Sequence, residues 1–565
     1  MVRVAFHGRR VGGWVVGLAD RAETDKPLQP LLKVSGLGPP PDVLELATWA
    51  AWRWAGRRSA LLRTASPPGM VVTLPLSSEP VTPVPARGGL AVTSSSGVVA
   101  EAFGRGLAVV RVPPGEDLLP FVVEAAGRGD ALVLAPSLSA AGFLAARLRR
   151  MGHPVAVVPR DWARAAAGGC VAVGARATAW APRPELGAVV VLDEHDEGYQ
   201  EERAPTWNAS DVAVERARRA GVPCVLTSPC PSLQALATAD LLTPARADER
   251  AGWPVVEVVD RRAEPPGSGL YSQRLVAVLR QAQPEARVVC VLNRKGRARL
   301  LACAACGELA RCERCDGAVS LETVSPGAGE LACRRCGAAR PPVCLACSGT
   351  RLKTLRVGVT RVREELELLA GRPVAEVTAD TDAGLPPPDA PVLVGTEAVL
   401  HRLAGALVPA QGPTRARVVA FLDLDQELLA SRYRAAEAAL ALLARAARLV
   451  GGRAGGGRIM LQTRLPASEV IDAAVHADPS RLAVVESARR AALRLPPEVA
   501  MALVSGEAAP AFVAGLAGMP GLEALGPSAG RWLVRAADHD VLCSGLAATA
   551  RPQGRLRVEV DPLRA

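Results

Sequence analysis

Eight cysteines in the middle of the chain form four pairs, each with the pattern C-x-x-C. Two thiolates at this spacing can lie on one tight turn and bind one metal ion, and two such pairs complete a tetrahedral site. The four pairs therefore predict two zinc ions per chain, with Zn–S distances of about 2.3 Å. The pairs are Cys303/Cys306, Cys312/Cys315, Cys333/Cys336 and Cys344/Cys347.

The spacing of the pairs favours a nested arrangement. The inner pairs would close a local ribbon around one zinc ion, and the outer pairs would meet at its base around the other. A serial arrangement would leave a very short loop in each site. A disulfide framework and a redox dithiol are the alternatives, but four pairs in one tight cluster favour zinc. No catalytic zinc is implied, because no coordination position stays open.

The composition indicates a large folded protein. At 565 residues, 49% of them hydrophobic, the chain should form roughly three to five domains. It contains no run of about 18 apolar residues, so no membrane span or membrane partner is predicted. Met1–Arg10 lacks the apolar core of a signal peptide. The other cysteines are scattered, which suggests free thiols and a cytoplasmic protein. They are Cys170, Cys224, Cys230, Cys290 and Cys543.

The net charge is +11, which favours a polyanionic partner, most often nucleic acid. A solvated basic surface without such a partner is the alternative, and charge by itself does not decide between them.

Apolar strand runs alternate twice with Ala/Arg-rich helical stretches, which predicts two parallel α/β units. The first series of strands is Leu107–Val112, Ala131–Ala135, Val155–Val158, Val189–Leu192 and Val222–Thr227. The second is Val288–Leu292, Pro373–Val377, Val392–Gly395, Val418–Leu424 and Ile459–Thr463. The cysteine cluster interrupts the second series, before a helix at Arg361–Leu369. Two short strands are expected in Val2–Val16, a helix in Val43–Thr64 and a last strand at Leu556–Val560.

Motifs along nearly the whole chain occur in the order of a known family. They include VLNRKGRARLLACAACGELARCERCDGAVS (291–320), VGTEAVL (394–400), FLDLDQELLASRYRAAE (421–437), GGRAG (451–455) and the terminal VDP (560–562). With these motifs the chain resembles the PriA family of bacterial replication-restart helicases.

The resemblance implies an α/β multidomain fold. It comprises a small β-rich N-terminal DNA-binding domain (1–75), a first RecA-like helicase lobe (86–245), a second lobe (246–300 and 351–470), an inserted double zinc-ribbon module (301–350) and an α+β C-terminal domain (471–565). Relative to the family, an initial strand of the N-terminal domain is missing, which indicates either a shortened domain or a misassigned start codon. It also implies that the outer cysteine pairs bind one zinc and the inner pairs the other, as the spacing favours.

The phosphate-binding loop of an ATPase, G-x-x-x-x-G-K-[ST], is found nowhere in the chain. The matching segment, 109–126, keeps Gly115, but Glu116 replaces the lysine and Asp117 replaces the hydroxyl residue. Pro113 and Pro114 also remove two backbone donors from the loop. A negative charge in place of the lysine repels phosphate, so ATP is not expected as a cofactor.

Other parts of an ATPase are altered as well. In the acidic segment Asp193-Glu194-His195-Asp196, either the first metal-binding acid falls on Leu192 or one residue is missing. The final arginine motif keeps Arg453 but has Gly456 where an arginine finger is expected. We therefore predict a vestigial nucleotide site and no catalytic residues. Its members are Gly115, Glu116, Asp117, Asp193, Glu194 and Arg453.

The resemblance places an aromatic-rich loop near DNA, which makes Tyr199 and Trp207 candidates for stacking on unpaired bases. Trp207 as an anchor of the core or of a loop is an equal alternative. A cluster of cations beside the cysteines offers candidate phosphate contacts, although each could be an ordinary surface charge. They are Arg294, Lys295, Arg297 and Arg299.

Together these features predict a DNA-binding protein of the replication-restart primosome, cytoplasmic and associated with the nucleoid. It would recognise stalled or branched forks and single strands, and recruit primosome and replication proteins for loading of the replicative helicase, without helicase activity of its own. An active ATP-dependent 3′-to-5′ helicase with an unorthodox phosphate site is one alternative. A zinc-ribbon nucleic-acid-binding scaffold in another process is the other.

Overall fold

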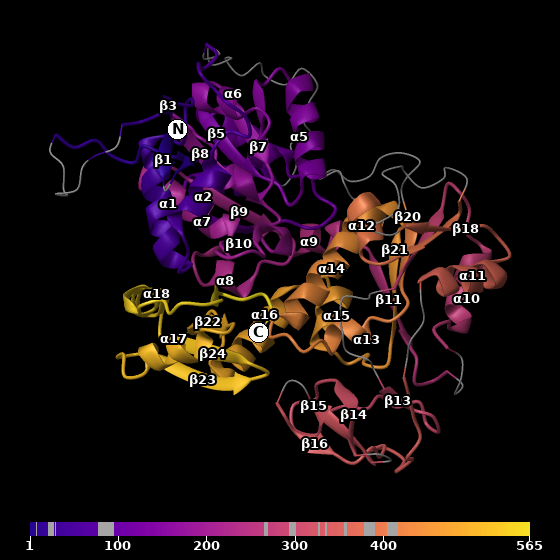
Figure 1. The fold of residues 1–565 in the computed structure, drawn as a ribbon. Helices are drawn as coiled ribbons and strands as arrows, with labels where there is room; N and C mark the ends of the chain where they lie inside the picture. Colours follow the sequence, from indigo (N-terminus) through magenta and orange to yellow (C-terminus); the bar gives the residue numbers. More distant parts are fainter. Residues whose placement is uncertain are drawn as a thin grey trace.

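Two parallel sheets form the body of the computed structural model (Figure 1). The structure describes all residues except 7, 21–27, 29, 77–94, 265–268, 293–300, 326–327, 334–335, 355–358, 378–389, 404–415 and 565. Among the described residues, no helix combines the length and the apolar character needed to cross a membrane.

Lobe 1 is a seven-stranded parallel sheet in the order β10-β4-β9-β8-β5-β7-β6. Its strands are short Val/Ala/Leu runs, as expected for strands that helices cover on both faces. The strands are β4 (Leu107–Arg111), β5 (Asp130–Leu134), β6 (Val155–Val158), β7 (Val171–Gly174), β8 (Leu186–Leu192), β9 (Cys224–Ser228) and β10 (Leu241–Leu242). The helices are α3 (Ser95–Phe103), α4 (Leu119–Ala126), α5 (Leu138–Arg150), α6 (Trp162–Ala167), α7 (Ala209–Ala220), α8 (Leu233–Leu236) and α9 (Arg246–Gly252).

Lobe 2 is a six-stranded parallel sheet in the order β11-β21-β20-β12-β19-β18. The strands are β11 (Val255–Asp260), β12 (Arg287–Val291), β18 (Val374–Val377), β19 (Val392–Gly395), β20 (Ala416–Phe421) and β21 (Arg458–Thr463). The helices are α10 (Gln273–Arg280), α11 (Val359–Ala370), α12 (Ala398–Leu403), α13 (Asp425–Leu428), α14 (Ala435–Val450), α15 (Glu469–Val475) and α16 (Ser480–Leu493).

The cysteine-rich module is inserted between β12 and α11 and lies beside lobe 2 (Figure 1). β14 (Val319–Ser325), β15 (Ala328–Cys333) and β16 (Ala339–Arg340) form an antiparallel sheet. β13 (Leu301–Cys303) pairs with β17 (Leu352–Thr354) where the chain enters and leaves the module.

The two ends of the chain pack against lobe 1. At the N-terminus, β1 (Val2–Phe6), β2 (Arg9–Gly13) and β3 (Lys33–Val34) form a small antiparallel sheet before α1 (Pro41–Arg53) and α2 (Arg58–Ala65). The C-terminal sheet has the order β23-β24-β22-β25, made of β22 (Ala500–Ser505), β23 (Glu523–Ser528), β24 (Arg531–Ala536) and β25 (Arg557–Val560). Its helices are α17 (Ala509–Leu516) and α18 (His539–Ala548).

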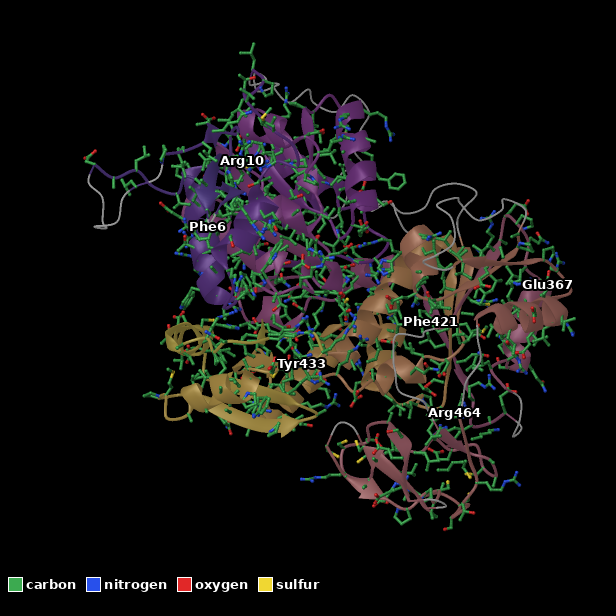
Figure 2. All side chains as sticks on the ribbon, in the orientation of Figure 1. Phe6, Arg10, Glu367, Phe421, Tyr433 and Arg464 are labelled. Atoms are coloured by element: carbon green, nitrogen blue, oxygen red, sulfur yellow. The ribbon has the colours of Figure 1, made fainter. Side chains whose placement is uncertain are left out.

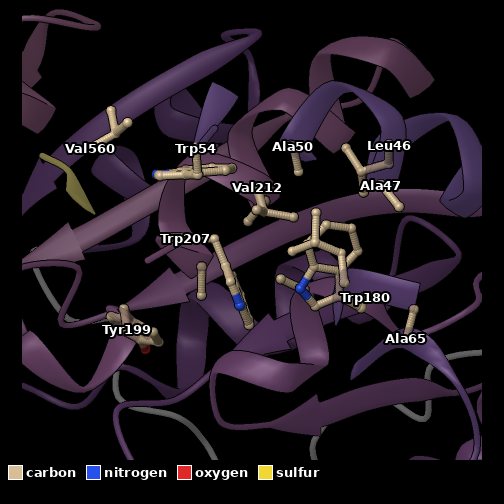
Figure 3. Close-up of a cluster of buried hydrophobic side chains, with 14 of the residues drawn as sticks. Leu46, Ala47, Ala50, Trp54, Ala65, Trp180, Tyr199, Trp207, Val212 and Val560 are labelled. Carbon is tan, nitrogen blue, oxygen red and sulfur yellow. The ribbon is translucent and has the colours of Figure 1, made fainter. Parts of the chain in front are cut away.

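One hydrophobic cluster joins helices α1 and α2, lobe 1 and the C-terminal sheet (Figure 3). Trp54, Trp180 and Val560, from three separate parts of the chain, are members of it. A buried ion pair adds to this contact: Arg53 of α1 donates to the Asp561 carboxylate at 2.7 Å. The domain boundaries predicted from the sequence stay predictions, but residues 41–65 share their core with lobe 1.

Candidate metal centres and a degenerate nucleotide site

The four C-x-x-C pairs form four turns of the same geometry. In each turn, the residue after the second cysteine has a positive φ, and its amide donates to the carbonyl of the first cysteine at 2.9–3.0 Å. Two of these residues are glycines, which adopt this conformation without steric cost. The residues are Gly307, Asp316, Gly337 and Ser348, with φ from 56° to 76°.

The turns bring the cysteines together in two groups, Cys303/Cys306/Cys344/Cys347 and Cys312/Cys315/Cys333/Cys336. This is the nested arrangement. The closest Sγ–Sγ distances between pairs are 3.5 and 3.6 Å in the outer group and 3.5 Å twice in the inner group. Four thiolates bound at about 2.3 Å in a tetrahedron lie about 3.8 Å apart. Each group of four sulfurs therefore fits one tetrahedrally coordinated ion such as Zn²⁺.

The segment that aligns with a phosphate-binding loop follows β4. The backbone N–H groups of residues 113–116 are already engaged in hydrogen bonds within the protein. Pro113 and Pro114 have no N–H group, the Gly115 amide donates to the Gly252 carbonyl at 3.0 Å, and the Glu116 amide donates to Pro113 at 3.0 Å. A phosphate needs several such amides pointing outward. Residues 113–116 have no backbone amide left to offer.

Three glycines from different elements meet at this loop. A Cβ on Gly115 would lie 2.9 Å from the Gly252 carbonyl oxygen, and one on Gly252 would lie 2.3 Å from the Pro113 Cβ. A Cβ on Gly452 of lobe 2 would lie 2.5 Å from the carbonyl oxygen of Ala251. Backbone of lobe 1, α9 and lobe 2 is therefore packed directly together beside the loop.

The two acidic residues of the loop, Glu116 and Asp117, are partly buried and lie among other protein groups. Asp117 accepts two hydrogen bonds from the Arg147 guanidinium, at 2.9 and 2.6 Å, and one from the Leu119 amide at 3.0 Å. Glu116 is half-buried, and burial, with nearby Asp248 and Asp117, raises its pKa. Neither side chain resembles the lysine or hydroxyl that a nucleotide site requires.

The acidic segment after β8 binds arginines of lobe 2. Asp193 accepts a bidentate pair of hydrogen bonds from Arg448, one of them at 2.9 Å, and Asp196 pairs with Arg445 at 2.6 Å. Both arginines lie on α14, an Ala/Leu-rich helix of strong helix formers. These carboxylates therefore join the two lobes. Sequence analysis missed both arginines, because nothing in the local pattern of an Ala/Arg helix marks a partner.

Glu194 faces into lobe 1. Its carboxylate accepts from the Ser232 amide at 2.7 Å and from the Ser232 hydroxyl at 2.9 Å. Burial raises the pKa of Glu194 to about 7, against the opposing effect of these hydrogen bonds. The neighbouring His195 is within 2.7 Å of the Ser228 hydroxyl, and burial lowers its pKa to about 4.

At the arginine motif, Gly456 has a φ of +65° and caps the short 3-10 helix Arg453–Gly455. Few residues other than glycine adopt this conformation readily, so an arginine at this position would be strained. Arg453, which the motif retains, is exposed.

The two aromatic candidates for DNA contact are core residues: for Trp207 this is the alternative that the sequence left open, and for Tyr199 burial argues against stacking on bases. Tyr199 is fully buried and donates its hydroxyl to the Leu192 carbonyl at 2.6 Å. Trp207 is 2% exposed and packs edge-on against Trp180, with ring centroids 5.5 Å apart (Figure 3). A base cannot reach either ring in this conformation. The four cationic candidates, Arg294, Lys295, Arg297 and Arg299, lie outside the described residues.

A cavity of about 600 Å³ lies between the lobes, next to the acidic segment and α14. Six arginines and seven carboxylates line it, and several of them pair with each other, such as Arg176 with Glu201 at 3.1 Å and Arg434 with Glu437 at 3.4 Å. The lining is close to charge balance, so its electrostatics do not favour a polyanion over other ligands.

The N-terminal sheet has one basic face, which the sequence analysis did not single out. Residues paired across strands share a face, and the register pairs Arg3 with Lys33 and Ala5 with Arg10. Arg3, Arg10 and Lys33 are exposed, and none of them forms an ion pair with a described carboxylate (Figure 2 labels Arg10). Like charges on neighbouring strands repel each other, so an anion on this face would stabilise it.

Comparison with known proteins places the chain in a family. It is 30% identical to the probable replication restart protein PriA of Mycobacterium bovis over 558 residues, which cover 90% of this chain and 82% of that protein. It is 27% identical to the replication restart protein PriA of Bacillus subtilis over 404 residues, 66% of this chain and 49% of that protein. The chain thus spans about half the length of the Bacillus protein. No protein-family model matches it.

Among solved structures, Saccharomyces cerevisiae Dbp5 bound to RNA and ADP BeF3 aligns with 69% of this chain and 89% of its own. The identity is 12% and the TM-score 0.38. The identity to the mycobacterial protein over most of both chains, and the nested cysteine groups inserted in the second of two parallel-sheet lobes, lead to one conclusion: the chain belongs to the replication restart protein PriA family.

Proposed function

We propose that this protein acts in replication restart as a DNA-binding scaffold that recognises stalled or branched forks, recruits partner proteins for helicase loading, and does not hydrolyse ATP. One observation carries the proposal: the groups that would bind a nucleotide bind protein instead. The Gly115 amide is bonded to Gly252, and the Asp193 carboxylate is bonded to Arg448 of the opposite lobe.

An ATP phosphate would have to displace these contacts and would then meet Glu116. At an effective dielectric constant of 20, two unit charges 4 Å apart interact by about 4 kcal/mol. In a functional loop the lysine attracts the phosphate by an energy of this size, whereas Glu116 would repel it by a similar energy. The bonded amides and the reversed charge act in the same direction, against nucleotide binding.

We further propose that each cysteine group holds a structural Zn²⁺. All-thiolate tetrahedral sites are typical of structural zinc, and such a site leaves no position for a substrate. When bound, the ions would supply cross-links that fix the four turns relative to one another. Freshly purified, reduced protein should therefore contain about two zinc per chain.

For the DNA contact, we propose the basic face of the N-terminal sheet. Arg3, Arg10 and Lys33 lie on one face, are exposed and have the spacing of neighbouring strands, which suits a phosphate backbone. Ala5 and Gly12 share this face and leave it flat. This face supports the proposal better than the interlobe cavity, whose charges are nearly balanced.

The test of the ATPase proposal is hydrolysis by zinc-loaded full-length protein, with and without forked DNA. We expect no turnover above a heat-inactivated sample. DNA-stimulated turnover that the substitutions Asp193→Asn and Arg453→Ala abolish would refute the proposal. Turnover that both variants retain would also refute the proposal if it elutes with the full-length protein in gel filtration, and would come from a contaminating enzyme if it does not.

DNA binding is tested by fluorescence anisotropy with forked, single-stranded and duplex DNA at several salt concentrations. Arg3→Glu and Arg10→Glu should weaken binding to all three and lower the salt dependence by about one unit for each lost phosphate contact. Arg150→Glu, an exposed cation on α5, is the matched control. Equal effects of all three variants would argue against this face.

A further inference from the structure

The two cysteine groups differ in their surroundings. In the inner group, Cys312 and Cys333 are buried members of a hydrophobic cluster that includes Leu331 and Val319. Its other two cysteines are partly buried against the same cluster. In the outer group, Cys306 and Cys347 are exposed. The core of the module therefore covers the inner group, whereas solvent reaches half of the outer group.

Few protein contacts would hold the two halves of the outer group together without a metal ion. The strands that bring its two halves together, β13 and β17, form only three residue pairs. A two-stranded ladder of this size is marginal in water on its own. The residue that lies over its sulfurs is Gly349, on which a Cβ would be 3.2 Å from the Cys303 sulfur and 3.3 Å from the Cys347 sulfur. No side chain at this position shields the sulfurs.

The outer group also lies at the contact with lobe 2. Ala302 and Leu309, on either side of the Cys303/Cys306 turn, form a small apolar cluster with Leu429 and Leu465 of lobe 2. Figure 1 shows the module beside this lobe, and Figure 2 shows Arg464, the residue before Leu465, at the lobe edge that faces it. The conformation of the outer turn therefore sets how the module sits on lobe 2.

We propose that the outer group is a releasable metal clamp. A thiophilic divalent ion such as Zn²⁺ bound there holds the module on lobe 2, and chelators or thiol-reactive compounds remove it while the inner ion stays. Loss of the outer ion would release the module as a body that is still folded around the inner site. The inference rests on both groups holding a metal, as proposed above, and is independent of DNA binding.

The first test is metal release from zinc-loaded full-length protein in excess chelator, followed with a metallochromic indicator. We expect two phases of one ion each. The fast phase should exceed the slow one by about tenfold or more, the size by which lost supporting contacts weaken a metal site. Alkylation with iodoacetamide, mapped by mass spectrometry, should label Cys306 and Cys347 in step with the fast phase and the inner cysteines only with the slow one.

A matched pair of variants tests the docking. Cys347→Ser should keep one ion, and hydrogen exchange should rise around Ala302 and Leu309 while the β14–β15 hairpin stays protected. Cys336→Ser, in the inner group, should instead deprotect that hairpin. If either variant fails to fold, the kinetics of the wild-type protein still decide the question.

Release of both ions in a single phase, or faster labelling of Cys312 and Cys333 than of Cys306, would overturn the proposal. A starting content clearly below two metal ions per chain would refute the two-metal assignment itself, and this inference with it. The two failures are therefore distinguishable.

Discussion

Replacing Arg448 with methionine should destabilise the contact between the two lobes. The Asp193 side chain is 5% exposed and its Arg448 partner 11% exposed. Methionine keeps much of the length and apolar stem of the arginine but leaves the Asp193 carboxylate buried without its bidentate partner. Removing one member of a buried ion pair typically costs about 3–5 kcal/mol. Because the Arg445 guanidinium is also near Asp193, we expect the lower end, about 3 kcal/mol.

The pH dependence of this loss has a definite sign. Burial by itself would raise the pKa of Asp193, but the Arg448 guanidinium outweighs it and holds the pKa below its ordinary value. For a carboxyl with a lowered pKa, the stabilisation is fully present above the unfolded-state pKa of about 3.9. It is lost as the pH falls through the folded-state pKa. In the Arg448→Met variant, burial is no longer outweighed by Arg448 and raises the pKa of Asp193. The cost of the substitution should therefore be largest near neutral pH and shrink as the pH falls, starting above about pH 4.

The measurement is urea unfolding followed by tryptophan fluorescence, since Trp180 and Trp207 report on lobe 1. A double-mutant cycle with Asp193→Asn isolates the coupling between the two side chains. The control is the exposed pair Arg105–Glu101, whose loss should cost about 1 kcal/mol or less.

If Arg448→Met costs no more than the control, or if the cycle gives no coupling energy, Asp193 does not form a stabilising ion pair with Arg448. The acidic segment would then not be what joins the two lobes.

Three further predictions concern single positions. Because burial raises the pKa of Glu194 to about 7, the folded protein binds more protons than the unfolded chain between about pH 4.3 and 7, so stability should fall with rising pH in this range. Glu194→Gln should flatten that part of the stability–pH curve measured by thermal unfolding. Gly252→Ala, which forces a Cβ against Pro113, should destabilise by about 1–3 kcal/mol in urea unfolding, whereas Gly142→Ala, with open space around it on α5, should be neutral or stabilising. Trp207→Ala should lose about 3–5 kcal/mol of stability because it empties a core position, and at a temperature where the variant is folded its affinity for single-stranded DNA should be unchanged.

Much of the fold is predictable from sequence because its strands are local apolar runs. All five strands predicted in the first series and all five in the second are present, with ends that differ by up to three residues. β7 was missed: it has only four residues, Val171–Gly174, and follows two glycines, so its pattern does not distinguish a strand from a loop. The partners of α14 were missed for a different reason, since Asp193 and Arg448 are 255 residues apart.

The aromatic residues illustrate the same limit. Tyr199 and Trp207 lie in a polar stretch that looks exposed in sequence, yet both are buried. Burial depends on what packs over a residue, and here Trp207 packs against Trp180 in a core that α1, α2 and β25 also reach, from distant parts of the chain.

By itself, the sequence determined the features that depend on neighbours along the chain: the four cysteine turns, the short buried strands, and the loss of the lysine, hydroxyl and finger of a nucleotide site. Only the tertiary structure decided which cysteines solvent reaches, that the Gly115 amide binds α9 while Asp193 and Asp196 bind the opposite lobe, and that three cations share one face of the N-terminal sheet. The physical reason is that spacing fixes local geometry, whereas burial and charge pairing arise when separately formed elements dock.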